Sequence, residues 1–104
     1  MLHHAETSEK AIEQHLRRRM ADLGLPCLKY SNPGESGYPD RLVCLPGGRV
    51  LWVELKSSGK RPTRMQLLRH DELRRLGHTV LVADSRTAVD GLADKITEGR
   101  TDDL

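Results

Sequence analysis

Apolar residues near the start of the chain recur every three or four positions, which is the spacing of a helix with one buried face. This stripe runs from Ile12 to Met20, and Thr7 or Ser8 before it can cap the first turn. A helix is therefore predicted from there to about Leu23. The glycine that follows is suited to ending it.

A second stripe with the same spacing lies in the third quarter of the chain. Thr63 and Gln66 at its start fit the capping box, in which the two side chains bond to each other's backbone N–H groups. The pattern predicts a helix that begins after Thr63 and ends at Gly77. A third helix is predicted from Thr87 to about Ile96.

Runs of Val and Leu predict strands in most of the remaining sequence. The segments from Asp40 to Leu45 and from Arg49 to Lys56 flank a Pro-Gly-Gly turn and are predicted to form a β-hairpin. Shorter strands are predicted at 26–30 and 79–82, whereas 31–37 is rich in turn formers and is expected to be a substrate-facing loop. This order of elements predicts an α/β fold with a small mixed β-sheet flanked by helices.

Length and composition restrict the class of protein. The chain has 104 residues, which predicts one domain over 1–104, with a core at about 8–96 and a frayed polar tail at 97–104. No apolar run approaches the ~20 residues of a membrane span, and the first residues do not resemble a secretory signal. Two cysteines without metal-binding spacing fit a reducing compartment. We therefore expect a cytosolic protein with no membrane contact.

The predicted hairpin brings two acidic residues together. A three-residue turn pairs Leu45 with Arg49, and counting outward from that pair places Asp40 opposite Glu54. Directly opposed side chains have Cβ atoms ~4.5–5.5 Å apart, and like charges at that distance are destabilising. A two-residue turn would move Asp40 by one position, so this register depends on the turn.

The opposed carboxylates favour a divalent cation. Strand alternation places Trp52, Glu54 and Lys56 on one face, so a basic group follows the acidic pair. Oxygen ligands suit Mg²⁺ or Mn²⁺, which in proteins also bind water and substrate phosphate. The histidines show no metal-binding spacing with the cysteines and are expected at the surface. They are His3, His4, His15, His70 and His78.

The first helix can supply a third carboxylate. At about 100° per residue, Glu9 falls in the centre of the apolar stripe and Glu13 at its edge. A carboxylate that faces a core is costly unless it is paired or binds a metal. Glu9 is therefore the better candidate to approach the acidic pair, although Glu13 remains an alternative.

Together these residues resemble the PD-(D/E)XK nuclease superfamily, and specifically its virus-type replication-repair nuclease branch, VRR-NUC. The matching features are a Pro-Asp pair ending at Asp40, the Glu-x-Lys of Glu54 and Lys56 after a hairpin, Gln66 on the next helix, and Glu9 on the helix before. A Pro-Asp pair with a distant Glu-x-Lys is a weak pattern by itself. Its order, together with the two helix residues, makes the resemblance specific over about residues 9–82.

The resemblance implies a restriction-endonuclease-like core and a metal-dependent deoxyribonuclease. Asp40 and Glu54 would bind Mg²⁺ or Mn²⁺, with the carbonyl of Leu55 as a further ligand, and Lys56 would be catalytic. Stand-alone members of the branch are similar to phage-type proteins that dimerise and nick branched DNA such as Holliday junctions. A homodimer acting on branched DNA is therefore expected.

Two further roles follow from the same resemblance. Glu9 would complete the acidic cluster through metal or water, and Gln66 would support the site. Helix capping explains Gln66 equally well, and the favourable position of an acid in a first helical turn explains Glu9. Both readings of each residue remain open at this point.

The charge distribution favours nucleic acid as the partner. Between Lys56 and His78 there are seven Lys or Arg against two Asp or Glu, whereas the segment after Ala83 is acidic. Lys60, Arg61 and Arg64 are the expected contacts to the DNA backbone. The alternatives are a non-catalytic nucleic-acid-binding module of the same fold, and a restriction-like or flap or strand-end nuclease.

Overall fold

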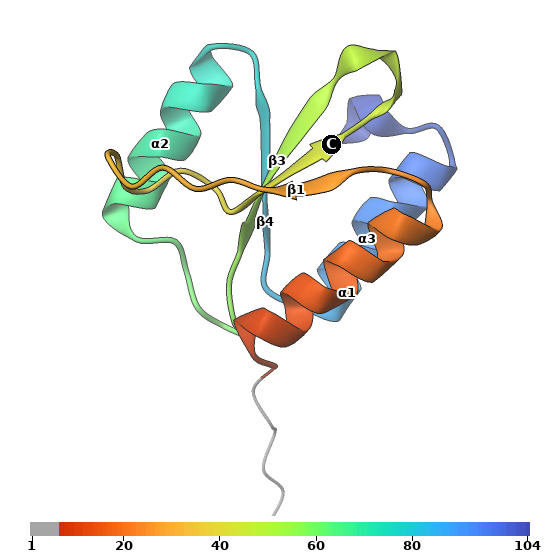
Figure 1. Ribbon diagram of the computed structural model, residues 1–104, viewed down its shortest axis with the longest axis horizontal. Helices are drawn as coiled ribbons and strands as arrows, with labels where there is room; N and C mark the ends of the chain where they lie inside the picture. Colours follow the sequence, from red (N-terminus) through yellow and green to blue (C-terminus); the bar gives the residue numbers. More distant parts are fainter. Residues whose placement is uncertain (1–6) are drawn as a thin grey trace, which may run out of the picture.

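The computed structural model describes residues 7–104 and contains a four-stranded sheet flanked by three α-helices (Figure 1). Two short 3-10 turns complete the fold. In chain order the elements are α1 (Glu9–Asp22), β1 (Cys27–Lys29), β2 (Arg41–Cys44), η1 (Pro46–Gly48), β3 (Val50–Leu55), α2 (Arg64–Arg75), β4 (Thr79–Ala83), α3 (Arg86–Thr97) and η2 (Thr101–Asp103). The α/β class and each predicted helix and strand are confirmed.

Local side-chain hydrogen bonds explain where the helices begin. The side chains of Ser8, Thr63 and Ser85 accept hydrogen bonds from the backbone N–H three residues later, and so cap α1, α2 and α3. The capping box of α2 is complete, because the Gln66 side chain also accepts from the Thr63 N–H. At the other end of α2, Gly77 adopts a φ of 93°, a conformation that favours glycine.

The sheet is mixed, with strand order β1-β2-β3-β4. The first three strands are antiparallel neighbours, and β4 lies parallel to β3. Leu45 donates its N–H to the Arg49 carbonyl across the three-residue turn at 2.8 Å, and Arg41 pairs with Val53. The register counted from the sequence is therefore confirmed. Asp40 directly precedes Arg41 and Glu54 directly follows Val53, so the two acidic residues lie next to this pair, on the same side of it.

The two faces of β3 pack against different helices. Figure 1 shows α1 and α3 side by side on one side of the sheet and α2 on the other. Leu51, Val53 and Leu55 are buried in the core with apolar residues of α1 and α3, whereas Trp52 and Glu54 face the side of α2. The alternation along β3 thus separates an apolar face from a polar one.

The C-terminal residues differ from the predicted frayed tail. Thr101–Asp103 form a short 3-10 turn, and Leu104 packs partly against the core. Arg100 holds the turn through ion pairs to Glu98 at 2.8 Å and Asp103 at 3.0 Å. The polar composition predicted fraying because one apolar residue at the end of the chain carries no periodic signal.

In the described part of the chain, no helix is long and apolar enough to cross a membrane.

Candidate active site

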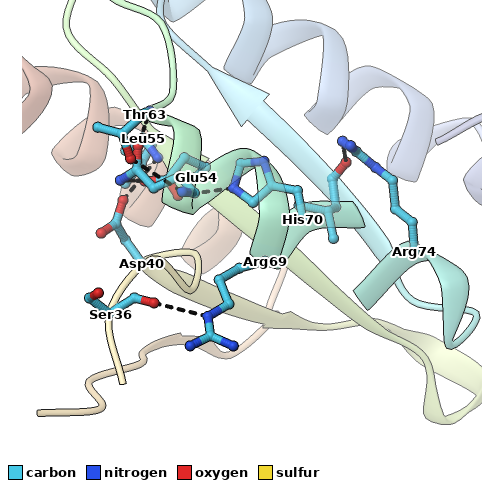
Figure 2. Close-up of polar contacts among 10 residues, drawn as sticks. Ser36, Asp40, Glu54, Leu55, Thr63, Arg69, His70 and Arg74 are labelled. Atoms are coloured by element: carbon cyan, nitrogen blue, oxygen red, sulfur yellow. Dashed lines mark hydrogen bonds and ion pairs between the residues drawn. The ribbon is translucent and has the colours of Figure 1, made fainter. Parts of the chain in front are cut away.

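Asp40 and Glu54 meet where β2 begins and β3 ends (Figure 2). The Asp40 Oδ2 atom accepts a hydrogen bond from the backbone N–H of Leu55 at 3.0 Å, which fixes this carboxylate against the end of β3. Glu54 is only 1% exposed. A carboxylate that is removed from water and lies beside a second one needs a proton or a cation.

Helix α2 holds the Glu54 carboxylate through two side chains. Gln66 donates from Nε2 to Glu54 Oε2 at 3.3 Å, and His70 Nε2 lies 3.1 Å from Glu54 Oε1. The Gln66 Oε1 atom accepts from the Thr63 N–H at 2.8 Å, so its Nε2 points towards Glu54. The amide oxygen of Gln66 therefore caps the helix, and its amide nitrogen contacts Glu54. The sequence presented these two roles as alternatives.

The surface assignment of the histidines is wrong for two of them. His70 is completely buried, and His15 is mostly buried and lies 2.7 Å from Asp90. His78 is exposed, and its Nδ1 accepts from the Trp52 indole; His3 and His4 lie outside the described residues. His70 follows Gln66 by four positions, and this helical spacing is the sequence signal that could have placed it beside Glu54.

The electrostatics of the site are set by burial. Burial, then the hydrogen bond and charge of Asp40, raise the pKa of Glu54 to about 9, and the charge of Lys56 opposes this rise. Burial and the charges of Arg74 and Lys56 lower the pKa of His70 below its ordinary value. A neutral His70 with its proton on Nε2 can donate to Glu54, which leaves the buried Nδ1 atom without a hydrogen-bond partner among the described residues.

The residues present fit a divalent cation as a shared partner. Two neighbouring carboxylates and a backbone carbonyl at Leu55 are hard oxygen donors, which is the set that Mg²⁺ and Mn²⁺ prefer. Within residues 7–104, no three His, Cys, Asp or Glu side chains are grouped so that they could hold a metal by themselves. A cation at this place would therefore complete its coordination with water and substrate oxygens.

The two candidate carboxylates of α1 have different environments. Glu13 forms an ion pair with the buried Arg41 at 3.2 Å, so its charge is already compensated. Glu9 is near enough for its charge to contribute to the raised pKa of Glu54. Its side chain is exposed, contrary to the core-facing position expected from the helical wheel, because it precedes the first buried residue, Ile12, by a turn. The structure thus leaves Glu9 as the available carboxylate.

The basic residues near the site differ in their exposure to solvent. Lys56 is partly buried and acts electrostatically on both Glu54 and His70. Lys60, Arg61 and Arg64 are exposed, and none of them forms an ion pair within the described chain. These three side chains are therefore available to a partner molecule.

The loop at 31–37 is anchored to α2 beside the site. Arg69 donates to the Ser36 carbonyl at 3.0 Å, as Figure 2 shows, and its guanidinium lies 4.7 Å from the centre of the Tyr38 ring. A Cβ atom on Gly37 would meet the Met65 side chain at 2.7 Å, and the φ of Gly37 is +94°. The loop approaches α2 so closely that only glycine fits at this position.

The chain is similar to a named phage protein and to a solved structure. A phage protein that carries the name "Putative nuclease p44", from Acyrthosiphon pisum secondary endosymbiont phage 1, is 45% identical over 78 residues, covering 75% of this chain and 84% of that protein. A solved structure described as a VRR_NUC domain has a TM-score of 0.79 and 36% identity, and the match covers 85% of this chain and 96% of the other. No family model matches the chain.

Proposed function

Since the chain belongs to the VRR-NUC family of nucleases, we propose that it is a Mg²⁺- or Mn²⁺-dependent endonuclease that hydrolyses phosphodiester bonds in branched DNA. The observation that supports this most is the buried Glu54 beside the partly buried Asp40, with Lys56 two residues after Glu54. Burying the Glu54 carboxylate lowers the stability of the fold. A residue with a purely structural role at this position would not need to be a buried carboxylate.

Each residue of the site has a distinct task in this proposal. Asp40, Glu54 and the Leu55 carbonyl hold the cation, and Gln66 fixes the orientation of Glu54. A bound divalent cation acts as a Lewis acid on the phosphate and lowers the pKa of water. The Lys56 ammonium orients the attacking water and offsets the negative charge that develops on the phosphate.

Glu9 has a supporting task at the edge of the same cluster. Its exposed carboxylate would accept a hydrogen bond from water near a bound cation, and Asp40 and Glu54 would remain the side-chain ligands. We expect Glu9→Gln to reduce cleavage less than the loss of Asp40 or Glu54 does, because the exposed Glu9 carboxylate competes with solvent.

Contacts with the DNA backbone lie on the segment between β3 and α2. Lys60, Arg61 and Arg64 are exposed and free of ion pairs in the described chain, and the loop at 31–37 lies on the other side of the site. Lys and Arg side chains in such positions neutralise phosphates, so binding is expected to weaken steeply as salt increases.

Selectivity for branched DNA is proposed to require two copies of the chain. Leu67 and Leu68 are each 52% exposed, and Leu76 is 74% exposed, all on or directly after α2. Exposed apolar side chains in this density are a feature of surfaces that associate. A homodimer would present two cleavage sites, which suits the two strands of a junction; sedimentation equilibrium measures whether it forms.

The deciding experiment compares cleavage of a labelled four-way junction, a flap and a matched linear duplex in Mg²⁺, Mn²⁺ or EDTA. We expect cutting that requires the metal, that favours the junction, and that falls about 10²–10³-fold in Lys56→Ala with DNA binding retained. Lys95→Ala, on α3, is the matched control for loss of a lysine.

The alternatives give different results in the same assay. Salt-dependent binding with no cutting in any metal would identify a non-catalytic nucleic-acid-binding module. Equal cutting of duplex and junction would favour a restriction-like enzyme, and cutting confined to the flap would favour a flap or strand-end nuclease. Unchanged cutting by Lys56→Ala would remove Lys56 from the catalytic role.

A further inference from the structure

Three consecutive arginines on α1 have different surroundings. Arg19 faces α3, where its guanidinium lies 3.0 Å from Asp90 and 3.7 Å from Asp94. Arg17 and Arg18 are exposed, and neither forms an ion pair within residues 7–104. Arg19 is thus a structural residue, and the other two are free to bind a ligand.

Arg17 and Arg18 border a groove between α1 and the β1 side of the sheet. The groove has a volume of about 390 Å³, and its lining contains no acidic residue; it consists of Gln14, Arg17, Arg18, Ala21, Leu25 and Cys27. Two guanidinium groups and one amide provide hydrogen-bond donors, and the planar fork of each guanidinium matches phosphate oxygens. The chemistry of the groove therefore fits an anionic backbone.

The groove lies farther along α1 than the candidate active site. The helix begins beside that site, because Thr7 and Ser58 exchange hydrogen bonds of 3.1 and 3.0 Å. At 1.5 Å per residue, Arg17 and Arg18 are about 12–14 Å along the axis from Glu9.

We propose that the groove bordered by Arg17 and Arg18 is a second phosphate-binding site, which holds the backbone of a duplex arm outside the candidate active site. The inference rests on the proposed action on DNA and adds the path that the substrate takes over α1. Gln14, one turn before Arg18 on the exposed side of the helix, donates to the same backbone.

The test measures equilibrium binding of a fluorescent duplex in EDTA at several salt concentrations, so that it does not depend on cleavage. For the double variant Arg17→Ala/Arg18→Ala we expect at least about fivefold weaker binding at low salt and a log–log salt slope reduced by about 1.8, because each phosphate contact contributes about 0.9. Arg17→Lys/Arg18→Lys is expected to restore most of the slope, since it keeps the charges.

The matched control is Arg75→Ala/Arg100→Ala, which removes the same formal charge from two exposed arginines outside the groove. If both double variants lose the same affinity and slope, net charge explains the effect and the groove proposal is overturned. An Arg17→Ala/Arg18→Ala variant that binds like the unchanged chain also overturns it, even where the unchanged chain cuts DNA. Failure of the unchanged chain to bind DNA would overturn the proposed function as well.

Cys27 provides a second measurement that needs no variant. It is a free cysteine in the groove, whereas Cys44 is a free cysteine outside it. Duplex DNA is expected to slow alkylation of Cys27 severalfold and to leave Cys44 unchanged, as followed by peptide mass spectrometry. Equal rates with and without saturating DNA would show that the groove stays empty in the complex.

Discussion

The two faces of β3 use the same six-residue strand for opposite purposes. On the side of α1 and α3, Leu51, Val53 and Leu55 are at most 1% exposed and contact only apolar neighbours of the core. On the side of α2, Glu54 is equally buried but is surrounded by hydrogen-bonding and charged groups. One face lowers the free energy of the folded state, and the other raises it because it buries the Glu54 carboxylate.

This difference shows which side chains offset the free-energy cost of burying Glu54. Burying the apolar side chains contributes about 1.5–3 kcal/mol each, which offsets the cost of keeping Glu54 away from water. Asp40, at the start of β2, is held by the backbone of the same strand that carries this core face. The acidic pair is therefore rigid because the opposite face of the strand is well packed.

The largest effect on stability is expected on the apolar face. Leu51→Ala should lower the free energy of unfolding by about 2–5 kcal/mol, because it removes buried methyl groups and leaves a cavity. Chemical denaturation measures this loss. A loss below about 1 kcal/mol would show that the core face of β3 is looser than its complete burial indicates.

On the polar face, Glu54→Gln should have the opposite sign. The neutral amide keeps the shape of the side chain and can donate to Asp40, so the metal-free protein at pH 8 should gain about 1–3 kcal/mol while cleavage is lost. Denaturation in EDTA and the junction assay measure the two outcomes. A destabilised Glu54→Gln would contradict the interpretation that the buried charge is costly.

The pH dependence of the metal-free protein should follow from the same residue. The pKa of Glu54 is about 9 in the folded state against 4.5 as its ordinary value, so folding favours its protonated form. The associated stability is fully present below about pH 4.5 and is lost as the pH rises towards 9. The melting temperature in EDTA should fall over that range, less so in Glu54→Gln, and Mg²⁺ should reduce the fall by binding the folded state.

His70→Gln tests the support that Glu54 receives from α2. The amide has one more rotatable bond than the imidazole and should orient Glu54 less well, so we expect an apparent metal affinity that is 10–100-fold weaker, as is typical for residues that hydrogen-bond to a metal ligand. Cleavage at saturating metal should recover most of its rate. A variant with unchanged metal dependence would leave His70 as a packing residue only.

The smallest effect on stability is expected at the start of α2, where Gln66 both completes the helix cap and contacts Glu54. Thr63→Ala should destabilise α2 by about 0.5–2 kcal/mol through loss of the cap and change cleavage little. Gln66→Glu should keep the capping box but place a third carboxylate against Glu54. We expect it to reduce the rate of cleavage markedly and the free energy of unfolding less. Equal losses in both properties for both variants would show that the capping box and the site are not separable.

Counting along the sequence was sufficient for the acidic pair but not for its surroundings. The turn between Leu45 and Arg49 determines the register, and this local feature placed Asp40 near Glu54. The wheel of α1 placed Glu9 towards the core, yet its side chain is exposed, because a wheel gives direction but not how far along the helix the sheet extends. His70 was missed because its only signal is the four-residue spacing from Gln66, and the sequence of α2 does not show which strand the helix covers.

The sequence by itself determined the helices and the hairpin register, because each depends on residues close together in the chain, and it also carries the residue pattern of the family. Only the tertiary structure decided that His70 lies behind Glu54, that Asp90 and Asp94 compensate Arg19 while Arg17 and Arg18 stay free, and that Leu104 closes onto the core. These facts depend on which side chains from distant segments meet. Their physical cause is the packing of α2 on one face of the sheet and of α1 with α3 on the other.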